Sequence, residues 1–401
     1  MFTVLALLFC SCGDTRISER SDTEPSVMTI DGDAWQTRIP FDLWFNLVFV
    51  PGTVNGKDSC WFILDTGFEY SLVNRDRLDS TVLQSARTHI EAQPGGDIEV
   101  TLVDGLTITA GAVTMAYDSV HAIPLGSLEP IAGRRIDGII GHDFFERFVV
   151  AIDYTLRELS IIEPAKFEYP GSGEVIPVVV ENNEPFMFAE VQLPDGSFKR
   201  AKLKLDTGSS DFIGFNGSYV QAVKLVTDTQ PKIPVLGTAV GGHTENWVTR
   251  IGAFRLNDVV IPNPVIGYSV DTLRGGDAGT IGGEFFKRFT PIFDYPHSRI
   301  IFEKNARFDD PIEYDMTGIF PYAEPPDFAT KRVLTVTPGS PAEKVGIAAG
   351  DQLLSINGIE AGRIGIGYLH RAFRQDGQSL ELILKREDST FAHILHLERM
   401  I

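Results

Sequence analysis

Short runs of branched and aromatic residues, separated by turns rich in glycine, proline and asparagine, recur along most of the chain. Such runs are typical of β-strands. Residues 39–50 form one, and Asn55-Gly56, a strong hairpin signal, precedes another at 60–64. Helical patterns are short, as at residues 143–148. The pattern therefore predicts a mainly β protein.

Two blocks of this pattern occur twice at one constant spacing. Asp-Thr-Gly follows an apolar strand at Asp65 and again at Asp206, and 206 − 65 = 141. An Ile-Gly step followed by two phenylalanines occurs at Gly141 and Gly282, and 282 − 141 = 141. Because distant blocks keep one offset, a whole structural unit has been copied; solenoid repeats are much shorter. We predict two similar lobes, lobe 1 at residues 30–165 and lobe 2 at residues 166–305.

Lobe 1 is predicted to place a carboxylate where a buried strand ends in a turn. The strand at residues 60–64 runs directly into Asp65-Thr66-Gly67. Gly67 allows a sharp bend and leaves its N–H free to face the carboxylate. Further on, Gly95-Gly96 separates two alternating strands. This pattern predicts a hairpin whose glycine-rich tip serves as a mobile flap, although an ordinary turn has the same signature.

Lobe 2 repeats this order. Lys202 and Lys204 alternate with leucines along a strand that ends in Asp206-Thr207-Gly208. Gly241-Gly242 then takes the position of the flap tip. Ser209 and Ser210 follow the turn without the sequence context of a nucleophile elbow, so a serine hydrolase is a poor interpretation.

Residues 313–401 have the pattern of a third module. Ser340 is a predicted helix N-cap, with Pro341 at the first helical position and Glu343 completing a capping box. Gly346 is expected to end that helix. Asn357-Gly358 marks a turn, and a further helix and two strands complete the module.

This module resembles a PDZ domain. The resemblance rests on residues 338–342 (Pro-Gly-Ser-Pro-Ala), on Gly350-Asp351 and on the Asn-Gly turn. It implies that peptide ends bind by strand addition beside a loop of backbone N–H groups, with Gly318, Ile319 and Phe320 as the binding residues. The alternative is a PDZ fold with a degenerate groove.

Composition and charge exclude several classes of function. The 401 residues include 54 acidic and 35 basic side chains, giving a net charge of −19, which disfavours nucleic-acid binding. The three cysteines provide neither a disulfide framework nor a cysteine-based zinc site in the folded body. The histidines are scattered and include no His-Glu-x-x-His motif. We expect no metal and no cofactor.

The N-terminus resembles a bacterial lipoprotein leader. An apolar run at residues 4–9, too short to span a bilayer, precedes Ser11-Cys12. The resemblance implies cleavage before Cys12, a lipid on this cysteine, and a flexible tether within residues 1–29. Membrane contact would then occur only through the anchor, and the location would be the cell envelope. Ordinary secretion is the alternative.

The paired Asp-Thr-Gly turns are the strongest chemical signal. Two carboxylates about 3 Å apart cannot both ionise, so they share a proton. One can then act as base on a water molecule while the other acts as acid on a carbonyl oxygen. Residues 40–305 accordingly resemble the pepsin-like and retropepsin-like aspartic proteases, and most closely a fused retropepsin dimer. The resemblance implies two β-barrel lobes related by a pseudo-twofold axis.

The resemblance assigns roles to both turns. Asp65 and Asp206 match the catalytic aspartates, and Thr66 and Thr207 match the threonines that bond across to the other lobe. The supporting glycines are Gly67 and Gly208. Phe68 departs from the family, which has a small residue there, and the pepsin flap tyrosine has no counterpart.

We therefore predict an aspartic endopeptidase whose PDZ module recruits polypeptide substrates. The alternative is an inactive or weakly active protein of the same fold that binds peptides in the cell envelope.

Overall fold

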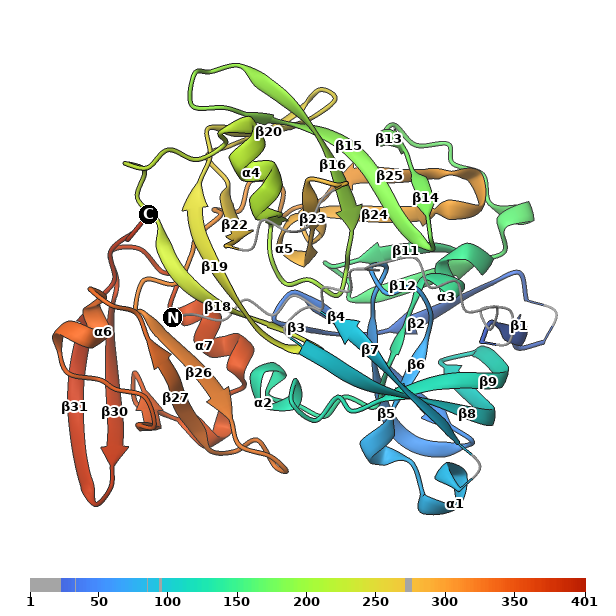
Figure 1. Ribbon diagram of the computed structural model, residues 1–401, viewed down its shortest axis with the longest axis horizontal. Helices are drawn as coiled ribbons and strands as arrows, with labels where there is room; N and C mark the ends of the chain where they lie inside the picture. The colour runs from blue at the N-terminus through green and yellow to red at the C-terminus, as the bar shows by residue number, and fades with distance from the viewer. Residues whose placement is uncertain (1–22, 33, 85, 94–95, 271–275) are drawn as a thin grey trace.

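The computed structural model describes residues 23–401 except 33, 85, 94–95 and 271–275. Within this part the chain is mainly β, as predicted, and forms four sheets (Figure 1). Cys12 with the predicted leader, and Gly95, lie outside the described residues. No helix in the described ranges has the length and apolar character needed to cross a bilayer.

Lobe 1 is built around a nine-stranded sheet. Its strands, in spatial order, are β1 (Pro25–Ile30), β9 (Val113–Ile123), β6 (Leu72–Asn74), β10 (Gly138–Ile140), β5 (Lys57–Leu64), β4 (Leu47–Val54), β8 (Gly96–Ala110) and β7 (Arg87–Gln93), with β3 (Asp42–Trp44) paired to β4. β8 pairs with β9 as well as β4, which brings distant parts of the sheet together.

Lobe 2 is built around a ten-stranded sheet. The spatial order is β18 (Ile233–Ala239), β19 (Gly242–Arg250), β22 (Val265–Ser269), β17 (Ile213–Phe215), β23 (Gly279–Ile281), β16 (Phe198–Leu205), β15 (Glu184–Gln192), β20 (Ala253–Leu256) and β21 (Val259–Pro262), with β14 (Val179–Glu181) paired to β15. Among the described residues this sheet lacks a pairing like that of β8 with β9, so the prediction of two β-barrels stays a prediction.

The duplicated blocks occupy equivalent places in the two sheets. β5 leads into Asp65 and lies parallel to β10, which also pairs antiparallel with β6. β16 leads into Asp206 and lies parallel to β23, which also pairs antiparallel with β17. The Ile-Gly strand of each lobe therefore flanks the strand that carries the aspartate.

A six-stranded sheet joins the lobes. Its order is β13 (Glu174–Pro177), β25 (Arg299–Lys304), β24 (Phe289–Asp294), β11 (Val149–Asp153), β12 (Glu158–Ile162) and β2 (Gln36–Pro40). β11 and β24 are repeat equivalents, and they pair antiparallel at its centre. This pairing places a local twofold axis between the two lobes.

The helices are short. They are α1 (Ser80–Leu83), α2 (Glu129–Ala132), α3 (His142–Arg147), α4 (Gly217–Val223), α5 (Gly283–Phe286), α6 (Pro341–Lys344) and α7 (Ile366–Ala372), with 3-10 turns η2 (Arg75–Arg77), η3 (Pro164–Lys166), η4 (Tyr295–His297) and η5 (Ala361–Arg363). α3 and α5 carry the repeated phenylalanines. Phe145 and Phe286 both pack on Phe293, so the two copies share one aromatic core.

The C-terminal module has its own sheet and core. The strand order is β26 (Ile319–Ala323), β27 (Lys331–Val336), β28 (Gln352–Ile356), β30 (Ser379–Arg386) and β31 (Ser389–His396), with β29 (Ile359–Glu360) beside β28. Ser340 caps α6 as predicted, accepting a hydrogen bond from the Glu343 N–H. The Glu343 side chain accepts from Gly339 N, one residue before the cap, rather than from the cap residue.

The module packs on lobe 1 through the β3–β4 turn. Phe45 and Asn46 have φ of 52° and 65°, as a type I′ hairpin requires, although this region disfavours a bulky side chain. The Phe45 ring packs on His370 of α7 in a tilted arrangement, with ring centroids 4.0 Å apart. Trp44 lies against Gly365 and bonds to the Ala132 carbonyl oxygen. β26 also contacts both α2 and α7 (Figure 1).

Replacing Phe45 should loosen the module. Phe45→Ala removes a half-buried ring, so local opening of β26 and α7 should become easier by about 2 kcal/mol. Hydrogen exchange should then be at least about tenfold faster in those two elements. Phe391→Ala, a partly buried ring on β31, is the matched control and should leave α7 protected. Unchanged exchange in Phe45→Ala would contradict this packing role.

Candidate functional site

The two Asp-Thr-Gly turns meet between the lobes. Each aspartate follows the last residue of its strand, and the backbone N–H of each donates a hydrogen bond to the neighbouring Ile-Gly strand. Asp65 N donates to Ile140 O at 2.9 Å, and Asp206 N donates to Ile281 O at 3.0 Å. Both side chains are fully buried.

Thr66 and Thr207 bind the turns to each other by reciprocal hydrogen bonds. The Thr66 hydroxyl donates to Leu205 O at 2.8 Å, and the Thr207 hydroxyl donates to Leu64 O at 2.7 Å. Each hydroxyl oxygen also accepts a bond from the other threonine's N–H, at 3.0 Å in both cases. Four hydrogen bonds therefore satisfy buried backbone groups that neither lobe could satisfy alone.

The carboxyl groups lie against the opposite turn. A methyl group added at Gly67 would collide with the Asp206 carboxyl carbon, and one added at Gly208 would collide with Asp65 Oδ2. Gly67 N donates to Asp65 Oδ1 at 2.8 Å. The other oxygen of Asp65 has no hydrogen-bond partner among the described residues. The N–H groups of Gly208 and Ser209 face the Asp206 carboxyl group and lower its pKa. Each carboxyl group therefore packs against the turn that carries the other, which is the arrangement that a shared proton requires.

Burial and mutual repulsion make it unfavourable for both carboxyl groups to ionise. Burial, followed by the charge of Asp206, holds the pKa of Asp65 well above its usual range. Burial also raises the pKa of Asp206, although the Lys204 charge opposes the rise. Two like charges in one site cannot both ionise at ordinary pH. The ionisation of each carboxyl group therefore depends on that of the other.

The predicted flap tips face each other. β7 and β8 form the hairpin of lobe 1, and β18 and β19 form the hairpin of lobe 2. An added methyl at Gly96 would lie 2.8 Å from Gly241 O, so the two tips are in contact. Gly96 and Gly242 have φ of 148° and 130°, a region that disfavours other residues.

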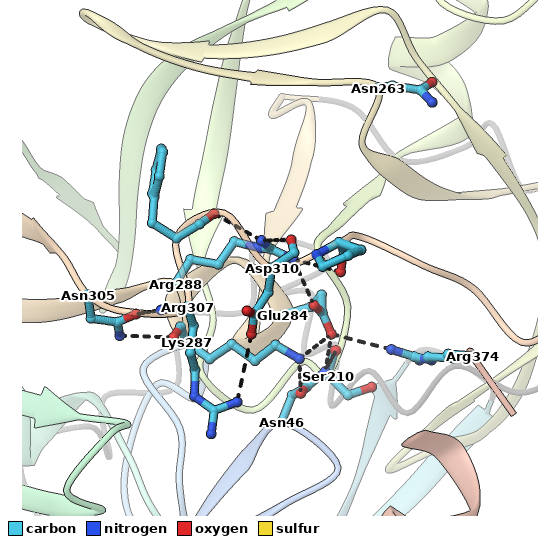
Figure 2. Close-up of polar contacts among 12 residues, drawn as sticks. Asn46, Ser210, Asn263, Glu284, Lys287, Arg288, Asn305, Arg307, Asp310 and Arg374 are labelled. Atoms are coloured by element: carbon cyan, nitrogen blue, oxygen red, sulfur yellow. Dashed lines mark hydrogen bonds and ion pairs between the residues drawn. The ribbon is translucent and has the colours of Figure 1, made fainter. Parts of the chain in front are cut away.

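A partly buried polar network braces the loop after Asp206 (Figure 2). Asn46 Nδ2 donates to Ser210 O at 2.8 Å and to Glu284 Oε2 at 3.0 Å. Lys287 Nζ lies 2.7 Å from Glu284 Oε2, and Arg374 Nη1, from the C-terminal module, lies 3.3 Å from it. The loop is thus connected both to the β3–β4 turn and to the C-terminal module.

The network keeps Glu284 ionised. Burial alone would raise the pKa of Glu284, but Lys287, Arg374 and Arg288 outweigh it and lower the pKa. Asp143, the lobe 1 equivalent, has neutral partners: Ser71 N and Oγ at 2.9 and 2.7 Å, and Tyr117 OH at 2.8 Å. Burial raises the pKa of Asp143. The two lobes therefore brace their turns by different chemistry.

The predicted peptide-binding loop of the C-terminal module is occupied by its own chain. Thr317 N and Gly318 N donate to Asp315 Oδ1 at 3.0 and 2.6 Å. Ile319 N donates to the Thr317 hydroxyl at 2.9 Å. Ile319 and Phe320 are buried, and Phe320 packs in a cluster with lobe 1 residues. Three N–H groups of the loop are thus bonded within the chain, and the peptide-binding role of Gly318, Ile319 and Phe320 stays a prediction.

Several residues of the site were not singled out by the sequence. Asn46, Arg374 and Asp315 carry no motif, and each reaches its partner only in the folded chain. Lys204 was identified only as one position of a strand, yet it is 5% exposed and lies beside the carboxyl pair. Among the described residues, no His, Cys, Asp and Glu side chains cluster as metal ligands would.

Comparison with protein families identifies one module. The PDZ domain family matches residues 332–386, so the chain contains a PDZ domain at its C-terminal end. Domains of this class generally bind peptide C-termini or extended segments. No curated protein matches the chain. The roles predicted for Asp65 and Asp206 stay predictions.

The reciprocal hydrogen bonds between Thr66 and Thr207 should contribute measurably to stability. Thr66→Val keeps the side-chain shape but leaves Leu205 O and Thr207 N without partners, which should cost about 2–4 kcal/mol. A lower urea midpoint would report this loss. Thr155→Val, at an exposed position, should change stability by less than about 0.5 kcal/mol. Equal urea midpoints for the two variants would show that these hydrogen bonds do not stabilise the fold.

The carboxyl pair should make stability fall with rising pH. The folded-state pKa of Asp65 lies above the unfolded value of about 3.9, so its stabilising contribution is present at low pH and is lost as pH rises through the folded pKa. Asp65→Asn should therefore raise the melting temperature by about 3 °C or more near pH 8, and by much less near pH 3. Asp258→Asn, at an exposed site, serves as control. A gain in melting temperature that is the same at pH 3 and pH 8 would contradict a raised pKa of Asp65 in the folded protein.

Proposed function

We propose that this protein is an aspartic endopeptidase. The observation that carries the proposal is the reciprocal pair of hydrogen bonds between Thr66 and Thr207, which holds two fully buried carboxyl groups against each other's turn. A pair that shares one proton can act as acid and base at the same time. The flap hairpins, whose tips touch through Gly96 and Gly241, support the same proposal.

In the proposed reaction, water attacks the peptide carbonyl directly. The ionised carboxyl accepts a proton from water as the oxygen bonds to the carbonyl carbon, and the other carboxyl gives its proton to the carbonyl oxygen. The carbon–nitrogen bond then breaks as the amine takes up a proton from one carboxyl group, while a hydroxyl of the tetrahedral intermediate returns its proton to the other. The pair thus ends with the one shared proton with which it began. Asp206 is the better candidate for the ionised member, since the charge of Lys204 favours its anion.

The PDZ domain has a different proposed role from substrate recruitment. Its loop N–H groups already bind Asp315 and Thr317, and the β3–β4 turn and α2 pack beside β26 and α7. Arg374 reaches Glu284, which Asn46 connects to the loop after Asp206. We infer that the domain binds its own chain and holds this loop in place.

The predicted anchor completes the proposal. A lipid on Cys12 would tether the enzyme to the cell envelope, with the polar residues that follow as spacer. This part rests on the leader-like sequence alone.

Peptide cleavage tests the proposal directly. Digestion of a peptide library from about pH 3 to pH 8 should yield products, and pepstatin should reduce them. Asp65→Asn and Asp206→Asn should each lower kcat/KM by about a thousandfold or more, because each removes half of the pair. Asp258→Asn should cleave like the wild type. Full activity in either pair variant would remove the mechanism, and absence of cleavage by wild type would leave a peptide-binding protein of this fold.

A further inference from the structure

A buried lysine approaches the carboxyl pair from one side only. Lys204 lies on β16, two residues before Asp206, and is 5% exposed. Its Nζ lies 3.4 Å from Gly67 O in the opposite turn and 3.1 Å from Glu184 Oε1 on β15. The equivalent residue in lobe 1 is Ile63, because 204 − 141 = 63. Lobe 2 thus has a charged side chain at a position where lobe 1 has an apolar one.

The lysine remains charged in this position. Burial alone would lower the pKa of Lys204, but the carboxylates of Glu184, Asp206 and Asp65 outweigh burial and raise it. The same charge lowers the pKa of both aspartates against the effect of burial. An opposite charge nearby favours the ionised form of a carboxyl group.

The other charged groups around Lys204 have partners of their own. Asp277 accepts from Asn216 Nδ2 at 2.7 Å, and burial raises the pKa of Asp277. Lys202 pairs with Glu181 at 2.6 Å. Glu184 is the carboxylate in direct contact with Lys204, so it partly neutralises the positive charge felt by the pair.

We propose that Lys204 is a positioning residue, an inference that rests on the proposed function. Its buried positive charge stabilises the singly ionised Asp65–Asp206 pair and extends that state to lower pH than burial alone would allow. Lys204 does not touch a substrate in this arrangement. It acts through the pair and through Gly67 O, which it holds from the opposite lobe.

A role confined to folding accounts poorly for these contacts. Ile63 fills the equivalent place in lobe 1 and is fully buried, so the fold accepts an apolar side chain there. An ion pair between Lys204 and Glu184 stabilises little after both charges are desolvated. The contact with Gly67 O instead directs the ammonium group toward the turn that carries Asp65.

Neighbouring substitutions should move the pH profile in opposite directions. Lys204→Met removes the positive charge, so both limbs of the kcat/KM profile should shift to higher pH by about one unit. Glu184→Gln leaves the lysine charge unopposed, so both limbs should shift to lower pH. The double variant Lys204→Met/Glu184→Gln lacks both charges, so its limbs should lie between those of the two single variants. A structural defect alone would lower activity at every pH without moving the limbs.

A direct titration separates this inference from the peptidase proposal. Carbon-13 NMR of the aspartate carboxyl carbons, assigned with Asp65→Asn and Asp206→Asn, reports ionisation even in a protein that cleaves nothing. Upward movement in Lys204→Met and downward movement in Glu184→Gln would support the inference. Unchanged midpoints in a folded Lys204→Met protein would overturn it. Should that variant fail to fold, unchanged midpoints in Glu184→Gln would overturn it equally.

Discussion

The hydrogen-bond exchange between Thr66 and Thr207 is the constraint on which the rest of the structure depends. Each hydroxyl satisfies a carbonyl oxygen and an N–H that belong to the other turn. Because unsatisfied buried backbone groups are costly, the turns cannot separate without losing all of these bonds. The carboxyl groups are thereby held near each other, and the charge of Asp206 helps to raise the pKa of Asp65. The proposed chemistry is a consequence of this backbone geometry.

The PDZ domain is part of the same arrangement. Phe45 occupies an unfavourable region of backbone space, and its stacking on His370 offsets that cost. The next residue, Asn46, contacts both Ser210 O and Glu284. A two-residue turn therefore connects the surface of the PDZ domain to the loop that follows Asp206. The domain and the carboxyl pair are neighbours in a single packed structure.

The sequence predicted the features that local pattern and repetition can carry. The mainly β fold, the short helix at α3, the Ser340 cap and the PDZ domain all depend on residues close in sequence. The constant offset of 141 residues also identified the two Asp-Thr-Gly turns as equivalent, although they lie far apart along the chain. A duplication reveals such a relation, whereas a local pattern does not.

Other features depended on contacts that no local pattern specifies. The alternation of Lys202 and Lys204 with leucines is typical of a strand with one solvated face, but the opposite lobe covers Lys204. The PDZ loop motif likewise could not indicate that Asp315 fills it. Arg374 meets Glu284 across ninety positions of sequence, and only the docking of the domain brings them together.

Fusion of the two copies into one chain has a consequence of its own. Where identical chains form a twofold pair, every substitution appears on both sides of the axis. Here Lys204 corresponds to Ile63 in the other copy, and Glu284 with its cations corresponds to Asp143 with its neutral partners. The two approaches to the carboxyl pair are chemically unlike. The two aspartates of the pair would therefore differ in acidity, a difference that the symmetry of two identical chains opposes.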